Sequence, residues 1–470
     1  MISEHDRSTG PAETGWRAAR RAVVLVLLVA VPLVFDTTVW PVFTLPKFTV
    51  AALGASIGLV LTAAEWVARR PVAPWETGLS GPVALVVGWT TVSAATSSEL
   101  STSILGSRES LNGLVTFALF AVIFLTTANA FDTPRVKTAL SVLWFGSGSA
   151  VLVYGALQLH DRWDPVPWVP FADLGAIWST LGNPNDLAGF LAIILPVGLT
   201  LLALVRHPVA RGLTVGMTVL LVAELVLASS RGAIVAAALA VVVVIACLRH
   251  RLASRVSLRP VLIASCAALL LGTGAFIAVG GEKVGAPGEL LATGQGSTVA
   301  LRVELWETAW RMGTENPLFG VGPDAFGRSF DAFRSDEFTD VYGPELVATD
   351  AHNLLLTRLA EQGVPGALAL LALFGATLAL LVRAGRELRR SRDTDDGYCL
   401  VVAVGAGLLA YIVQAMFNRQ DIALDFCFWV LLGLACALGR SAQPRAAGSA
   451  RLAGAHERDQ GDEDGERAYA

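Results

Sequence analysis

Long apolar runs, separated by short polar stretches, dominate the chain. The runs have about 17–25 residues, the length that an α-helix needs to cross about 30 Å of hydrocarbon. This pattern predicts an all-α, polytopic membrane protein with about twelve transmembrane helices. The expected spans are 23–39, 46–66, 81–98, 112–130, 138–158, 186–205, 212–228, 232–248, 260–281, 353–382, 398–416 and 421–438.

Composition and charge agree with this class. Of the 470 residues, 54% are hydrophobic and 16% are charged, whereas a soluble domain has about 25% charged residues. The net charge of −4 gives no basic surface that would indicate nucleic acid as a partner. The five cysteines lie in or beside apolar runs and lack the spacing of metal ligands, so no metal site is expected.

The basic residues predict the orientation. With the N-terminus in the cytoplasm, 24 of the 35 basic residues fall in inside segments, as the positive-inside rule requires. We therefore expect cytoplasmic tails at 1–22 and 441–470, the second one disordered, around a single domain at 23–440 in the cytoplasmic (inner) membrane. One long loop, 282–352, lies outside and holds twelve acidic and five basic residues. A loop of this length is typical of a functional segment.

Four polar clusters lie at the predicted outer face. Asn183, followed by Pro184, is expected to cap a helix whose N-terminus offers free N–H groups to an anion. Arg231 lies between two spans with no room for a loop, where it is costly unless it snorkels or has a partner. Arg302 belongs to an amphipathic helix with tryptophans suited to the headgroup layer, and His352 enters a span from outside. Each cluster also has a purely structural explanation. Asn183 then only caps a helix, and Arg231 only anchors the topology. The helix of Arg302 is then a plain interfacial helix, and His352 is a polar residue whose hydrogen bonds are satisfied.

In their order along the chain, these clusters resemble the O-antigen ligase and O-antigen polymerase superfamily. The matching stretches are GNPNDLAGFLA (182–192), SSRGA (229–233), RVELWETAW with ENPLFGVGPDAF (302–326) and AHNLLLTRLAEQGVPG (351–366). The stretch LGSRESLNGL (105–114) resembles the first outer loop of that family. The resemblance covers roughly residues 100–370.

The resemblance implies a GT-C-like membrane glycosyltransferase that inverts the sugar linkage and uses neither metal nor cofactor. Such enzymes transfer a glycan from a polyprenyl (undecaprenyl) diphosphate carrier to a hydroxyl of a glycan, lipid or protein acceptor. The positions that match the essential residues of the family are Arg231, Arg302 and His352. Arginine forks suit phosphate oxygens, and a neutral histidine is a suitable general base. A second interpretation, in which His352 holds phosphate, stays open.

Other polar residues near these positions are candidates for substrate binding. They are Asn183, Asn185, Asp186, Arg108, Asn353 and Glu361. Asp186 departs from the family pattern, which often has a large apolar or aromatic residue there; it either contacts the acceptor sugar or extends the helix cap.

The alternative functions are a membrane transporter and a non-catalytic assembly partner in polysaccharide export. A transporter predicts internal repeats and broken helices in both halves, which the sequence does not display. Ligase and polymerase differ only in the acceptor, and both stay open.

The predicted orientation can be tested by thiol labelling. A cysteine at Ser297, in a cysteine-free background, should react with a membrane-impermeant thiol reagent in intact cells, because 282–352 is predicted to face outside. Labelling that needs permeabilised cells would contradict the topology and with it the placement of all four clusters.

Overall fold

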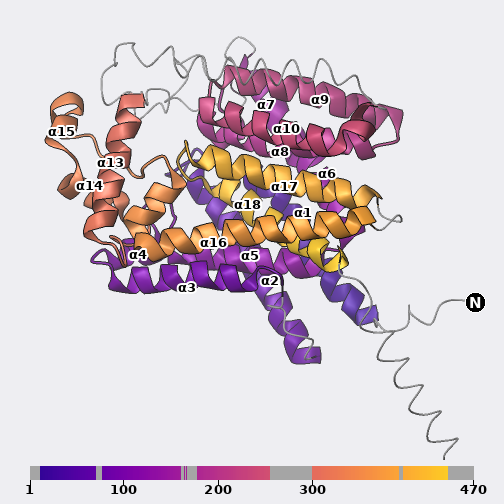
Figure 1. The fold of residues 1–470 in the computed structure, drawn as a ribbon, viewed down its shortest axis with the longest axis horizontal. Helices are drawn as coiled ribbons and strands as arrows, with labels where there is room; N and C mark the ends of the chain where they lie inside the picture. Colours follow the sequence, from indigo (N-terminus) through magenta and orange to yellow (C-terminus); the bar gives the residue numbers. More distant parts are fainter. Residues whose placement is uncertain are drawn as a thin grey trace, which may run out of the picture.

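The computed structural model describes residues 11–69, 77–159, 164, 166, 177–253, 299–390 and 395–442. Within these ranges the chain forms helices joined by turns and loops, and none of them contains a strand. The long helices lie side by side, roughly along one direction (Figure 1). The expectation of an all-α fold is therefore confirmed for the described part of the chain.

Eleven of the expected spans coincide with helices, and the span at 260–281 lies outside the described residues. Within the described residues, eight helices are long and apolar enough to cross a membrane, so the chain is a multi-pass membrane protein, while the count of twelve stays a prediction. The helices at the expected spans are α1 (Pro11–Leu33), α2 (Thr44–Arg69), α3 (Ser80–Thr96), α5 (Leu114–Ala130), α6 (Thr133–Val142) with η2 (Leu143–Gly148) and α7 (Ser149–Leu159), α8 (Pro184–Leu204), α9 (Pro208–Leu227), α10 (Arg231–Ala253), α16 (Leu354–Arg390), α17 (Asp395–Ala415) and α18 (Ile422–Ala442). The shorter helices are α4 (Leu100–Leu105), η4 (Ser179–Leu181), α13 (Val299–Glu315), α14 (Phe326–Phe333) and α15 (Asp336–Tyr342).

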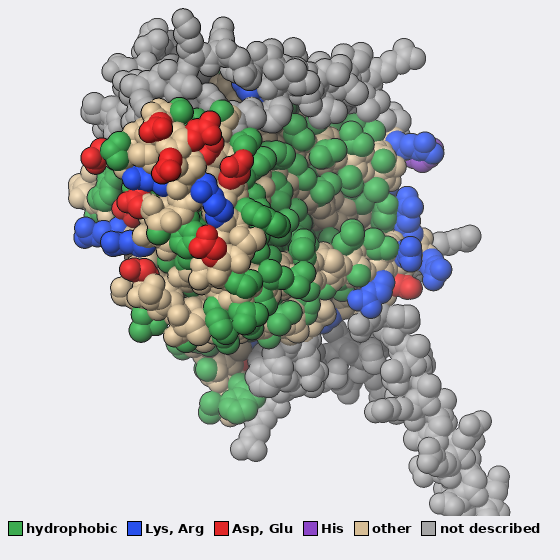
Figure 2. All heavy atoms as spheres, turned by 60° about the vertical axis from the view of Figure 1, so that its left-hand side comes forward, with side chains coloured by type: hydrophobic (Ala, Val, Ile, Leu, Met, Phe, Trp, Pro, Cys, Tyr) green, Lys and Arg blue, Asp and Glu red, His purple; other side chains and the backbone are tan. Residues whose placement is uncertain are grey.

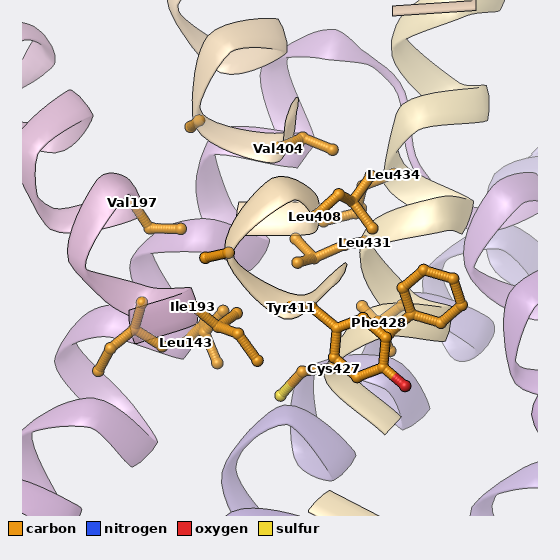
Figure 3. Packing of buried hydrophobic residues seen from close by; sticks show 14 of the residues in the cluster. Leu143, Ile193, Val197, Val404, Leu408, Tyr411, Cys427, Phe428, Leu431 and Leu434 are labelled. Carbon is orange, nitrogen blue, oxygen red and sulfur yellow. The ribbon is translucent and has the colours of Figure 1, made fainter. Parts of the chain in front are cut away.

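Helices α8 and α18 form the centre of the bundle and are almost completely buried, whereas α2 and α9 expose most of their apolar length. Figure 3 shows the packing of α8, α17 and α18, where Leu408 lies beside Leu431 and Leu434. The rings of Tyr411 and Phe428 stack there at 4.5 Å between centroids. Because lipid is as apolar as leucine, such close packing, rather than exclusion of water, holds the helices together.

The two ends of the bundle differ in charge. At one end, ion pairs join segments that are far apart in the sequence. Arg20 pairs with Glu65 at 2.6 Å, and both Arg251 (3.5 Å) and Lys137 (3.8 Å) approach Asp396. The sequence predicted all five residues to lie near or beyond the cytoplasmic ends of their spans. Figure 2 shows an apolar belt between this end and an end of mixed charge. The alternation of sides agrees with these contacts, while the absolute orientation stays a prediction.

At the opposite end lie α13, α14 and α15 (Figure 1, left), which belong to the predicted long loop. We call residues 299–352 the outer cap; residues 282–298 of the loop lie outside the described residues. The outer cap has a small apolar core of its own, which includes Leu305, Met312, Phe326 and Phe330. Three helices, α13, α14 and α15, lie within the outer cap.

The outer cap is fastened to α16 where that helix breaks. Gly363 has a left-handed backbone (φ 68°) and interrupts α16 inside the expected span 353–382. The interruption frees backbone groups, which bond to the turn 317–322: Val321 N donates to Ala360 O at 3.0 Å and Val364 N donates to Pro317 O at 2.8 Å. In a membrane protein every such group needs a partner, so the turn and the break stabilise each other.

Replacing Gly363 by alanine should destabilise this junction. A Cβ atom at that position would lie 2.5 Å from Leu318 O, on a backbone conformation that side chains rarely adopt. We expect a loss of about 1–3 kcal/mol of stability, measured as thermal unfolding of purified protein in detergent. The matched control is Gly375→Ala in the same helix, where nothing lies within 4 Å. Equal melting temperatures of the two variants would contradict this role of Gly363.

Candidate functional site

The entrance of α8 forms the first part of the site. Asn183 is the N-cap, as predicted, and its Oδ1 accepts from Asn185 N at 2.8 Å, with Pro184 at the first helical position. The buried Lys47 holds the preceding turn, because its Nζ donates to Thr180 O at 2.7 Å and to Val34 O at 2.8 Å. The sequence analysis did not single out Lys47, since its partners are backbone carbonyls that carry no sequence signal.

Asp186, in the first turn of α8, pairs with an arginine that the motifs did not include. Its Oδ2 accepts from Arg419 Nη2 at 2.8 Å, and the side chain of Asp186 is 1% exposed. The carboxylate of Asp186 raises the pKa of Arg419, so the guanidinium stays charged. Oδ1 of Asp186 has no hydrogen-bond partner in the described part of the chain. Asp186 is therefore more than an extension of the helix cap.

Arg231 and Arg302 lie near each other on different elements. Arg231 begins α10, and the next residue packs on the loop between α17 and α18: a Cβ on Gly232 would lie 2.6 Å from Phe417 Cβ. Burial and then the charge of Arg231 lower the pKa of Arg302 on α13. Nε of Arg302 is buried without a hydrogen-bond partner, and neither arginine has an acidic partner among residues that the structure describes.

His352 precedes α16 with a left-handed backbone (φ 50°). Its backbone N donates to Asp350 Oδ1 at 2.8 Å, and its ring Nδ1 lies 2.7 Å from the same oxygen. The second contact falls short of hydrogen-bond geometry and is a close approach of the ring to the carboxylate. Burial would raise the pKa of Asp350, but the interactions with His352, and with Arg419, bring it below its usual value. Ala351, between the two residues, packs in the same cluster as Leu301 beside Arg302.

The other predicted binding residues have different surroundings. Asn353 is a helix cap, since its Oδ1 accepts from the backbone N of Leu355 and of Leu356, both at 3.1 Å. Glu361 is buried and pairs with Arg358 at 3.1 Å. Arg108 is exposed in the loop before α5. Substrate contacts of these residues and of Asn183 and Asn185 stay predictions.

Asp324 joins the outer cap to the stretch before α5. Its carboxylate accepts from Ser107 N at 2.6 Å, Asn112 N at 3.0 Å and Ser110 Oγ at 2.5 Å. Burial raises the pKa of Asp324, and these hydrogen bonds oppose the rise. The motif at 105–114 is therefore part of the same site, through a residue whose importance the sequence did not reveal.

A narrow cavity lies between these elements. Five of its lining residues are carboxylic and one is basic: Glu109, Asp324, Asp350, Glu361, Asp421 and Arg419. The site is thus divided into a basic side at Arg231 and Arg302 and an acidic cavity, with Asp350 linking the cavity to His352. In the described residues no group of three His, Cys, Asp or Glu side chains is placed to hold a metal ion.

Comparison with known proteins bears on the family. A search of curated proteins finds no match. The family model described as O-antigen ligase matches residues 216–371, which contain Arg231, Arg302 and His352. This match confirms the resemblance of the chain to the O-antigen ligase and O-antigen polymerase superfamily over these residues.

Proposed function

We propose that the chain transfers a glycan from a polyprenyl diphosphate carrier to an acceptor hydroxyl at the outer face of the cytoplasmic membrane. The match to the O-antigen ligase family model supports a role in surface polysaccharide assembly. The observation that supports the donor is the pair Arg231 and Arg302. Two neighbouring guanidinium groups, one with a buried nitrogen that lacks a partner, repel each other unless an anion lies between them. A diphosphate supplies that anion and matches the arginine forks.

The acidic cavity fits the other substrate. Carboxylates accept hydrogen bonds from hydroxyl groups, and a cavity with five carboxylic residues and one arginine repels phosphate. A hydroxyl-rich acceptor therefore belongs in the cavity and the diphosphate at the arginines. In this arrangement Asp186 acts through Arg419, which lines the cavity, and keeps that guanidinium fixed.

The proposed reaction is a displacement at the anomeric carbon of the donor sugar. The acceptor oxygen forms a bond to that carbon while the bond to the phosphate oxygen breaks, and polyprenyl diphosphate leaves with the electron pair. The attack from the opposite side inverts the linkage. The acceptor proton passes to His352 Nε2, because a proton on Nδ1, facing Asp350, leaves Nε2 free to accept it. Arg231 and Arg302 stabilise the charge that develops on the leaving group.

The first test concerns the leaving group. Arg302→Ala should lower the rate of transfer by about 10²–10³-fold, as expected for the loss of one electrostatic contact. Arg302→Lys should fall between this variant and the wild type, because it keeps the charge but not the fork. The assay is transfer of a purified polyprenyl diphosphate glycan by detergent-solubilised protein, without and with a chelator, which should have no effect.

The matched control for Arg302 is Arg328→Ala, since Arg328 is an exposed arginine of the same outer cap. It should retain wild-type activity. Near-normal transfer by Arg302→Ala would refute the proposed role of the arginine pair. Strong inhibition by a chelator would show that a metal ion takes part.

The second test separates a base from a phosphate ligand at His352. If His352 takes the proton, His352→Gln should lose about 10²–10⁴-fold in rate while the affinity for the donor persists. If His352 is charged and holds phosphate, His352→Lys should retain activity and His352→Gln should lose donor affinity. Transfer rate and donor affinity are measured in parallel.

Asp350→Asn extends this test to the partner of His352. We expect a loss of rate smaller than that of His352→Gln, with unchanged donor affinity, because the amide no longer favours the proton on Nδ1. The lowered pKa of Asp350 means that the wild-type pairing is present above the ordinary carboxyl pKa and is lost only as the pH falls through the lowered value. Asp340→Asn, an exposed acid of the same outer cap, is the control. Equal rates of Asp350→Asn and Asp340→Asn would contradict the orienting role.

A further inference from the structure

Helix α13 carries two buried nitrogen donors one turn apart. Arg302 Nε and Trp306 Nε1 are both buried, and neither makes a hydrogen bond to any residue that the structure describes. Positions four residues apart lie on the same face of an α-helix and about 6 Å apart along its axis. The two donors therefore belong to one face of α13. A buried indole N–H usually has a hydrogen-bond partner, so the N–H of Trp306 is available to a ligand.

The contacts of α13 place Trp306 inside the candidate site. On one side of it along the helix, Arg302 is close enough to Arg231 for their charges to interact. On the other side α13 packs on α16, since a Cβ on Gly313 would lie 2.5 Å from Leu359 Cγ. The ring of Trp306 packs against the apolar core of the outer cap, as does Leu356 in the first turn of α16. Trp306 therefore lies between the arginine pair and the helix that His352 precedes.

The next tryptophan of α13 has different surroundings. Trp310 is 58% exposed, so its indole N–H reaches water or lipid headgroups, as is typical of an interfacial tryptophan. Burial separates Nε1 of Trp306 from such contacts. The two tryptophans therefore have different roles, although both continue the four-residue spacing that begins at Arg302.

We propose that Trp306 binds the diphosphate of the lipid carrier through its indole N–H, beside Arg302, an inference that rests on the function proposed above. An indole N–H can only donate, and the oxygens of an ionised diphosphate accept strong, charge-assisted hydrogen bonds. Because the indole is neutral, it adds a hydrogen bond without adding to the repulsion between Arg231 and Arg302. Trp306 is thus a binding residue for the carrier and has no part in holding the acceptor.

The test measures how tightly the full-length protein, in phosphatidylcholine nanodiscs, binds polyprenyl diphosphate that carries no glycan. Trp306→Phe removes the N–H and keeps an aromatic ring for packing. It should weaken binding about 10–100-fold, the factor for one hydrogen bond to a charged group. Trp306→His keeps a ring N–H and should recover part of that loss, which a purely structural role of the indole would not produce. Thermal unfolding of both variants, measured in parallel, should stay close to that of the wild type.

Trp310→Phe is the matched control on the same helix and should bind the carrier like the wild type. Wild-type affinity in Trp306→Phe, or an equal loss in Trp310→Phe, would overturn the proposal. Arg302→Ala separates this result from the proposed function. If Arg302→Ala weakens binding and Trp306→Phe does not, the role of Trp306 is wrong and the proposed function stands. If Arg302→Ala also binds like the wild type, the proposed function itself fails.

A second arm distinguishes the carrier from the headgroup of an ordinary anionic lipid, which offers the same phosphate oxygens. The titration is repeated in phosphatidylglycerol nanodiscs. A difference between the wild type and Trp306→Phe that disappears there would assign the indole N–H to a lipid headgroup and refute the proposal. A difference that persists supports binding of the carrier.

Discussion

The break of α16 at Gly363 is the constraint on which the outer face of the molecule depends. A helix interrupted near the membrane surface leaves backbone groups without their usual partners, and hydrocarbon offers no replacement. Here the turn 317–322 supplies them, as Gly322 N donates to Glu361 O at 2.8 Å. Helix α3 adds two more donors: Trp89 Nε1 bonds to Gln362 O at 2.8 Å and Ser93 Oγ bonds to Glu361 O at 3.1 Å. The outer cap is thereby held at a fixed position over the bundle, and Arg302 and His352 with it.

The arginines of this face differ in whether their charges have partners. Arg358 is buried but fully engaged, with Glu361 at 3.1 Å, Gln420 at 2.8 Å and the ring of Phe117 beneath it. Removing one member of such a network leaves an uncompensated charge, which is costly in a protein interior. Arg302 has no comparable set of partners among the described residues. The charge of Arg358 therefore has partners, whereas the charge of Arg302 lacks them among the described residues. Arg302 belongs to the basic side of the site.

The sequence predicted the helices well because bilayer thickness imposes a length on every apolar run. The cap at Asn183 was also predictable, since a residue with a side-chain acceptor stands directly before a proline. The partners of the polar residues were not predictable. Asp186 and Arg419 are 233 positions apart, and Asp324 bonds to Ser110 from 214 positions away. Pairing at such distances follows from how helices pack, and no local pattern records it. The pair Gly363 and Pro365 in "QGVPG" is a local signal for a break, although its partner turn is not encoded nearby.

The division of the site has an evolutionary consequence. Its basic side comes from α10 and α13, whereas the acidic cavity is built from the loop before α5, the turn at Asp324 and the loop between α17 and α18. Mutations in the second group of segments change the recognition of one substrate and leave the recognition of the other untouched. Under the function proposed above, related chains can therefore diversify the acceptor while sharing one carrier. A chimera that exchanges the outer cap alone separates Asp324 from its partners at Ser107, Ser110 and Asn112. The outer cap and the loop before α5 therefore have to change together. That loop lies far outside the residues that match the family model.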